Sequence, residues 1–156
     1  MRIGIIVSNF PNKHPFYSKE LTNSKWGGVE NVVYEMVLKL NKIGHNIVVF
    51  TTSPKKENLI LKFENICIIR YGKQFKIGKR NLSLNYIFKI FKHDLDIIHI
   101  QRGIPLNLFI GYFLKIFKRI PGITTIHNVY KPHDKTLGAT IFSRVLINLF
   151  KKPSFW

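Results

Sequence analysis

Short, almost continuous runs of apolar residues are the feature that most restricts how this chain can fold. They are found at residues 2–8 (RIGIIVS), 46–52 (NIVVFTT), 65–71 (NICIIRY), 96–100 (DIIHI) and 123–127 (ITTIH). Runs of this length suit strands that are covered on both faces, as the strands of a parallel sheet are. We therefore expect a strand at each of these places.

Segments with helical periodicity lie between these runs. In the clearest one, apolar residues recur every three or four positions from Val29 to Ile43, and Gly44 stands where the helix is expected to end. Further helices are expected at residues 84–91, 105–118 and 136–151, and loops at residues 9–25 and 73–81. Strands that alternate with helices predict an α/β fold with a doubly wound, mainly parallel sheet.

Length and composition limit the classes of protein that this chain can be. Its 156 residues are enough for one domain with a core, and a single cysteine, Cys67, rules out an internal disulfide framework. The longest apolar stretch, residues 104–114, is well short of the roughly 20 residues that cross a bilayer, and no signal peptide is visible. We expect a cytoplasmic protein.

The charge of the chain is strongly positive, because 25 Lys and Arg residues against 8 Asp and Glu give a formal net charge of +17. One explanation is attraction to polyanions, such as anionic lipid head groups or nucleotide diphosphates. The other is a composition rich in lysine, isoleucine and asparagine, since the lysines are scattered over every segment. No nucleic-acid-binding motif is present, so nucleic acid is not expected as a partner.

Residues near the carboxyl ends of the predicted strands are candidates for a site, because ligands bind there in doubly wound sheets. Gly27 and Gly28 open the first helix, where free N–H groups attract phosphate; a plain helix-initiating turn is the alternative. His99 lies within a strand, and a hydrogen-bonded core histidine is the alternative. His127 and Asn128 stand at the end of the last predicted strand. The histidines lack zinc-ligand spacing, so no metal is expected.

Four stretches, in this order, resemble glycosyltransferase family 4, whose members have the two-domain GT-B fold. They are the strand IGIIVS, the stretch Gly27-Gly28-Val29-Glu30 with its helix up to Gly44-His45 and NIVVFTT, the strand DIIHI, and Thr125-Ile126-His127-Asn128. The resemblance extends from residue 1 to about residue 135. It implies one Rossmann-like domain over residues 1–156, equivalent to the acceptor-binding N-terminal half of such an enzyme.

The resemblance also implies an activity. Family members transfer a sugar from a nucleotide-diphosphate donor to an acceptor with retention of anomeric configuration, typically without a metal, and no cofactor is expected. The implied roles are donor-diphosphate binding by Gly27 and Gly28, catalysis by His127, and substrate contact by His99, Asn128 and Glu30. The loop 9–26 is expected to shape the pocket for a glycan or lipid-linked acceptor.

The chain departs from the family pattern in two respects. Gln101 stands where many members carry a second histidine, and no second Rossmann-like half with an E-x7-E stretch follows. We therefore expect the donor-binding domain to be absent and the chain to be inactive alone. The expected partners are a separate donor-domain polypeptide and an anionic membrane surface. A non-catalytic basic binding module and the product of an interrupted gene are the alternative interpretations.

Overall fold

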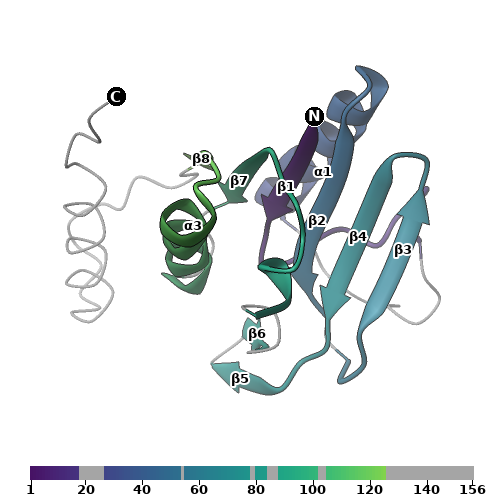
Figure 1. The fold of residues 1–156 in the computed structure, drawn as a ribbon. Coiled ribbons are helices and arrows are strands. Elements are labelled where there is room, and N and C mark those ends of the chain that lie inside the picture. The colour runs from purple at the N-terminus through teal and green to yellow at the C-terminus, as the bar shows by residue number, and fades with distance from the viewer. Residues whose placement is uncertain (18–26, 54, 78–79, 84–87, 102–104, 126–156) are drawn as a thin grey trace, which may run out of the picture.

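The computed structural model describes residues 1–17, 27–53, 55–77, 80–83, 88–101 and 105–125 (Figure 1). The helices are α1 (Gly28–Lys42) and α3 (Pro105–Lys118). The strands are β1 (Arg2–Ile6), β2 (Asn46–Thr52), β3 (Leu59–Phe63), β4 (Ile66–Tyr71), β5 (Phe75–Ile77), β6 (Arg80–Leu82), β7 (Ile97–Gln101) and β8 (Gly122–Thr125).

Within the described residues, six strands form one sheet in the order β3-β4-β2-β1-β7-β8 (Figure 1). β1 pairs in parallel with β2 on one side and with β7 on the other. β4 continues the parallel pairing beyond β2, and β8 continues it beyond β7. β3 runs antiparallel to β4 at the edge. The mainly parallel α/β sheet that the sequence predicts is confirmed.

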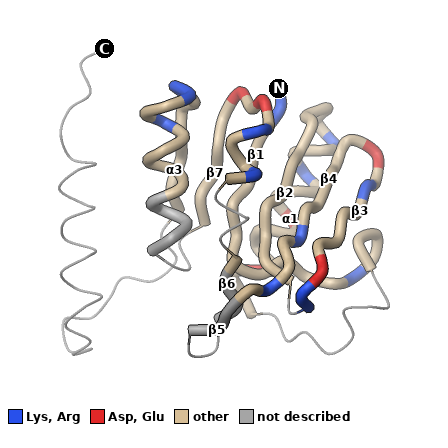
Figure 2. Tube along the Cα trace, turned by 60° about the horizontal axis from the view of Figure 1, so that its bottom comes forward, with Lys and Arg blue, Asp and Glu red and all other residues tan. Residues whose placement is uncertain are grey.

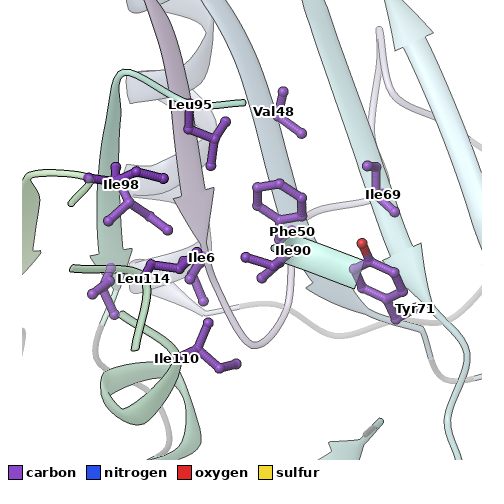
Figure 3. Packing of buried hydrophobic residues seen from close by; sticks show 12 residues of the cluster. Ile6, Val48, Phe50, Ile69, Tyr71, Ile90, Leu95, Ile98, Ile110 and Leu114 are labelled. Atoms are coloured by element: carbon purple, nitrogen blue, oxygen red, sulfur yellow. The ribbon is translucent and has the colours of Figure 1, made fainter. Parts of the chain in front are cut away.

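Each face of this sheet is covered by apolar packing. On one face, Val33 and Val37 of α1 are fully buried against strand residues that include Ile5. On the other face, Ile110 and Leu114 of α3 are equally buried. Figure 3 shows this second cluster, whose further members include Ile6, Phe50, Ile90 and Ile98. Full burial of one such side chain stabilises the fold by about 1.5–3 kcal/mol.

The ends of α1 are fixed by local interactions. At its start, the Gly27 N–H donates to Glu30 Oε2 at 3.0 Å, which satisfies one amide just before the first turn. At its end, Gly44 has a φ of +88° and its N–H donates to the Asn41 carbonyl at 2.9 Å. A positive φ is disfavoured for residues with a Cβ, so the glycine stops the helix where the sequence predicts.

Two strand regions differ from the prediction. Residues 73–81 were expected to form a loop, but they contain most of the antiparallel pair β5–β6. Strands of three residues carry too little periodicity to be recognised in a basic segment. β3 was not expected either, because it lies at the sheet edge and leaves much of its surface in solvent, with Ile60 57% exposed.

The remaining helix and strand predictions agree where they can be compared. α3 spans the predicted residues 105–118, and β8 begins one residue before the predicted strand 123–127. Residues 88–90 of the predicted helix 84–91 are helical, whereas its residues 84–87 lie outside the described residues, as do residues 126–127 of the last strand and the predicted helix 136–151. Among the described helices, none has the length and apolar character needed to cross a membrane.

Charged residues are distributed over many elements (Figure 2). Lysine and arginine residues occur on helices, strands and connections alike. In the part of the chain that the structure describes, one Lys–Asp ion pair is found within 4 Å, between Lys118 and the exposed Asp94 at 3.7 Å. Most of the positive charge on the described residues therefore contributes little to stability through ion pairing.

Candidate functional site

The candidate site lies at the edge where the parallel strands end. β4, β2, β1, β7 and β8 all run in the same direction, so their carboxyl ends share one edge of the sheet. β1 is the point at which the sheet order changes direction, because its two neighbours come from the two halves of the chain. α1, which follows β1 in the chain, packs on one face of the sheet and α3, which follows β7, on the other. Such a switch point is where doubly wound sheets bind ligands.

Gly27 and Gly28 lie at the beginning of α1, after the connection that leaves the end of β1. Both residues are exposed, and Gly27 has an ordinary extended backbone with φ −106°. A Cβ built on Gly28 would meet no described atom within 4 Å, and one on Gly27 would meet only the flexible Glu30 carboxylate at 3.2 Å. Neither backbone strain nor packing among the described residues requires a glycine here.

Glu30 has a structural role in this turn. Its Oε2 accepts the hydrogen bond from the Gly27 N–H, so the carboxylate holds the residue that precedes the helix. The carboxylate also lies at the positive end of the helix dipole, where a negative charge is stabilised. Contact of Glu30 with a substrate stays a prediction.

His99 lies near the end of β7, on the face of the sheet that carries α1. Its neighbours Ile98 and Ile100 belong to the core under α3, whereas Ile97 packs against the core under α1. Successive strand residues point to opposite faces, so His99 shares the face of Ile97. The structure thus places the imidazole on the same face as α1, beside the central strand residue Ile5.

The His99 imidazole is held by two neighbours. Its Nε2 lies 2.7 Å from Thr125 Oγ1 on β8 and 3.2 Å from Gln101 Nε2 at the end of β7. Gln101 Nε2 can donate to His99 Nε2 only in the tautomer that carries its proton on Nδ1. Gln101, which is 2% exposed, is thus a buried hydrogen-bond partner of His99.

Threonines at the end of β2 fix the beginning of the loop after β1, and the sequence interpretation missed them. The Ser8 carbonyl accepts hydrogen bonds from Thr52 Oγ1 at 2.7 Å and from Thr51 Oγ1 at 3.3 Å. The Thr52 N–H also donates to it, at 3.4 Å. Two consecutive threonines that close an apolar strand are a usable signal for this arrangement. They determine where the loop leaves the sheet.

The predicted catalytic residue His127 and its neighbour Asn128 lie outside the described residues, so the structure does not relate them to Gly27, Gly28 and His99. Across the described ranges, no group of three or more His, Cys, Asp or Glu residues is placed to hold a metal ion.

A groove of about 330 Å³ lies at the opposite edge of the sheet. Arg2, Lys62 and Cys67 are among its lining residues. Burial raises the pKa of the Cys67 thiol, although Lys62 and Arg2 act in the opposite direction. The thiol is therefore protonated at neutral pH. Because the groove is at the amino ends of the strands, it is separate from the candidate site.

Comparisons with known proteins agree with this fold. The sequence model of Glycosyltransferase Family 4 matches residues 26–153. The structure of sucrose-phosphate synthase from Thermosynechococcus elongatus is similar, with a TM-score of 0.58 and 14% sequence identity. The match covers 93% of this chain and 39% of that one, so this chain spans well under half the length of that protein. No curated protein sequence matches significantly. The shared fold is a Rossmann-like α/β domain.

Proposed function

This chain belongs to glycosyltransferase family 4, and from that premise we propose that it is the acceptor-side domain of a retaining, nucleotide-sugar-dependent glycosyltransferase. The observation that carries the proposal is the position of Gly27 and Gly28. They lie at the first turn of α1, on the candidate edge, and no described contact or backbone strain requires them to be glycines. An open glycine turn at a helix N-terminus suits a ligand that approaches the backbone closely.

The donor diphosphate is the ligand that we assign to this turn. The first amides of α1 have no partner within the helix, and the helix dipole adds partial positive charge at the same place. A diphosphate accepts hydrogen bonds from such amides and gains charge on its leaving oxygen as the sugar departs. Donors that are already oriented toward that charge lower the barrier without reorganisation.

The histidines are assigned to the sugar side of the reaction. His127, by its match to the family motif, is the residue that we place beside the transferred sugar. His99 is a positioning residue whose ring is held by Thr125 and Gln101. Asn128 and Glu30 are assigned to substrate contact, and Glu30 acts at least through its bond to Gly27.

A donor-binding domain is the partner that the proposal requires. The structurally similar sucrose-phosphate synthase is more than twice as long as the part that matches this chain. In GT-B enzymes the second domain faces the first across the cleft and supplies the cations that neutralise the leaving diphosphate. Without those charges the main electrostatic stabilisation of the transition state is missing. We propose that the chain turns over a nucleotide sugar only together with such a domain.

The test compares the chain alone with the chain co-expressed with a family-4 donor-binding domain. Nucleoside diphosphate release is measured over a panel of nucleotide sugars and glycan or lipid-linked acceptors. We expect release from the pair and not from the chain alone. Turnover by the chain alone would contradict the need for a partner, and the lack of any turnover over the whole panel would contradict the transferase assignment.

The Gly28→Ala variant tests the diphosphate assignment. The new Cβ meets no described atom, so folding should be unaffected, but it would obstruct a diphosphate at the turn. Loss of one backbone hydrogen bond to a charged ligand predicts a rise in donor KM of about tenfold or more. Gly44→Ala, at the other end of α1, is the matched control and should leave donor KM unchanged. Equal donor KM values for the wild type and Gly28→Ala would refute the assignment.

A further inference from the structure

Arg70 is a buried cation on β4 whose function the family match does not explain. Its side chain is 3% exposed, and its two terminal nitrogens donate to the backbone of a loop about 60 residues earlier in the chain. Nη1 lies 2.9 Å from the Phe10 carbonyl, and Nη2 lies 2.9 Å from the Pro11 carbonyl. The guanidinium carbon is also 5.9 Å from the centre of the Phe10 ring.

No carboxylate pairs with Arg70 among the described residues. Its Nε is buried without a hydrogen-bond partner. Burial lowers the pKa of Arg70 to about 10, so the side chain still carries its charge at neutral pH. Burying an unpaired charge is unfavourable, and among the described residues two carbonyl dipoles and one aromatic face offset the cost. The compensation for the buried charge therefore comes from the loop that contains Phe10 and Pro11.

The same loop is held from a second side by α1. The Tyr34 hydroxyl donates to the His14 carbonyl, and Lys13 Nζ lies 3.9 Å above the Tyr34 ring. The rings of Phe10, Phe16 and Tyr34 contact one another, with centroids 5.7 to 6.2 Å apart. Residues 9–17 thus lie between an arginine of β4 and a tyrosine of α1.

This loop leaves the end of β1 at the edge where the candidate site lies. Its first residue follows Ser8, whose carbonyl is fixed by Thr51 and Thr52. We infer that Arg70 is a positioning residue that fixes the conformation of the loop 9–17 at this edge and thereby determines acceptor binding. The effect on the acceptor rests on the proposed function, whereas the effect on the loop does not.

Arginine is suited to this role because its planar fork offers two parallel donors to two adjacent carbonyls. A lysine keeps the charge but presents it as a point, so it cannot reproduce both bonds at once. A methionine fills similar space with neither charge nor donor. Comparison of Arg70→Lys with Arg70→Met therefore separates the contribution of the charge from that of the bidentate hydrogen bonds.

The first experiment is amide hydrogen exchange on the purified chain, with the free energy of unfolding measured in parallel. We expect Arg70→Met to accelerate exchange in residues 9–17 by about tenfold or more relative to β2, and Arg70→Lys to restore part of the protection. Ile69→Val is the control, because it removes one buried methylene from the same strand without touching the loop. It should show no selective acceleration at residues 9–17.

The second experiment measures kinetics of the chain paired with a donor-binding domain. We expect Arg70→Lys to raise the acceptor KM while kcat and donor KM stay within about twofold of the wild type. Unchanged loop exchange in both Arg70 variants, or a mobile loop with an unchanged acceptor KM, overturns the inference. If the wild-type pair shows no turnover, the proposed function fails, and the exchange experiment still decides whether Arg70 fixes the loop.

Discussion

His99 and Thr125 link β7 to β8 through their side chains, with His99 Nε2 2.7 Å from Thr125 Oγ1. The two strands also pair in parallel through their backbones, with Gln101 opposite Thr125. The imidazole is therefore held by the last described residue of β8 before any ligand arrives. A ring that is oriented in advance loses less entropy when it acts on a bound substrate.

Thr125→Val removes the hydroxyl while keeping the shape of the side chain. We expect it to lower the free energy of unfolding by about 1 kcal/mol, because His99 loses one hydrogen-bond partner in a half-buried place. The measurement is urea denaturation followed by circular dichroism. Thr124→Val, at the exposed preceding residue, is the control and should change stability by less than about 0.5 kcal/mol. Equal effects of the two variants would show that the bond contributes nothing.

Much of the fold is predictable from the sequence because the central strands are buried on both faces. The runs that form β1, β2, β4 and β7 contain mostly apolar residues. Their side chains pack into two hydrophobic clusters, one on each face of the sheet. α1 was equally predictable, since Gly27 and Gly44 mark its ends by different mechanisms. The antiparallel edge strand β3 was not, because partial exposure removes the continuous apolar signal.

The site is only partly predictable for a different reason. Gly27, Gly28 and His99 stand out in the sequence because they occur at the start of a helix and inside an apolar run. Arg70 was not singled out, because its partners are backbone carbonyls about 60 residues away. Backbone acceptors leave no residue-type signature, so such a contact becomes visible only in the folded chain. The partners of His99 are side chains, and they were missed for another reason: Thr125 lies on a different strand, so only the register of β7 and β8 brings it beside His99.

Gly72 is expected to tolerate no side chain. A Cβ at this position would lie 1.8 Å from the Lys56 carbonyl oxygen and 2.5 Å from its carbon, both of them backbone atoms. The neighbouring bonds from Gly72 N–H to Asn58 Oδ1 at 2.8 Å and from Lys73 N–H to the Lys55 carbonyl at 2.7 Å hold the two segments together. Moving residues 55–58 away from residues 72–73 would therefore break these hydrogen bonds.

We expect Gly72→Ala to reduce the free energy of unfolding by about 2 kcal/mol or more, or to prevent folding. Thermal denaturation of the soluble protein measures the effect, and the soluble yield covers the case in which folding fails. Gly28→Ala is the matched control, since its Cβ meets no described atom and its stability should equal that of the wild type. A Gly72→Ala protein as stable as the control would mean that these two segments are not packed as described.

Substitution of Gly44 is expected to lower stability because of the backbone conformation of this residue and not because of steric contacts. Its φ is +88°, and no described atom lies within 4 Å of a Cβ built there. We expect Gly44→Ala to cost about 1 kcal/mol of stability, because an L-residue is strained in this region. Gly44→Asn should cost less, since asparagine adopts positive φ more readily. Chemical denaturation measures the stability of both variants. A larger loss for Gly44→Asn than for Gly44→Ala would point to a cause other than backbone strain.

His93 makes stability depend on pH on the acidic side of neutrality. Its ring packs edge-on against Phe50, with centroids 5.1 Å apart. Burial lowers the pKa of His93 below its ordinary value of 6.5, Arg2 and Lys118 lower it further, and Asp94 opposes them. The folded state therefore binds this proton less readily than the unfolded state. The stabilising contribution is present above pH 6.5 and is lost as the pH falls from 6.5 through the lowered folded value.

The His93→Phe variant isolates this effect, because it keeps an aromatic ring beside Phe50 and removes the titrating group. We measure the free energy of unfolding of both proteins by urea denaturation at a series of pH values from 7.5 down to 5.0. The difference, wild type minus variant, should decrease as the pH falls through this range, since all other groups titrate equally in both proteins. A difference that stays constant, or that grows toward acid, would show that the His93 ring is not kept neutral by burial. The sign is decisive here, because pairing of His93 with Asp94 as its dominant interaction would raise the folded pKa and make the difference grow toward acid.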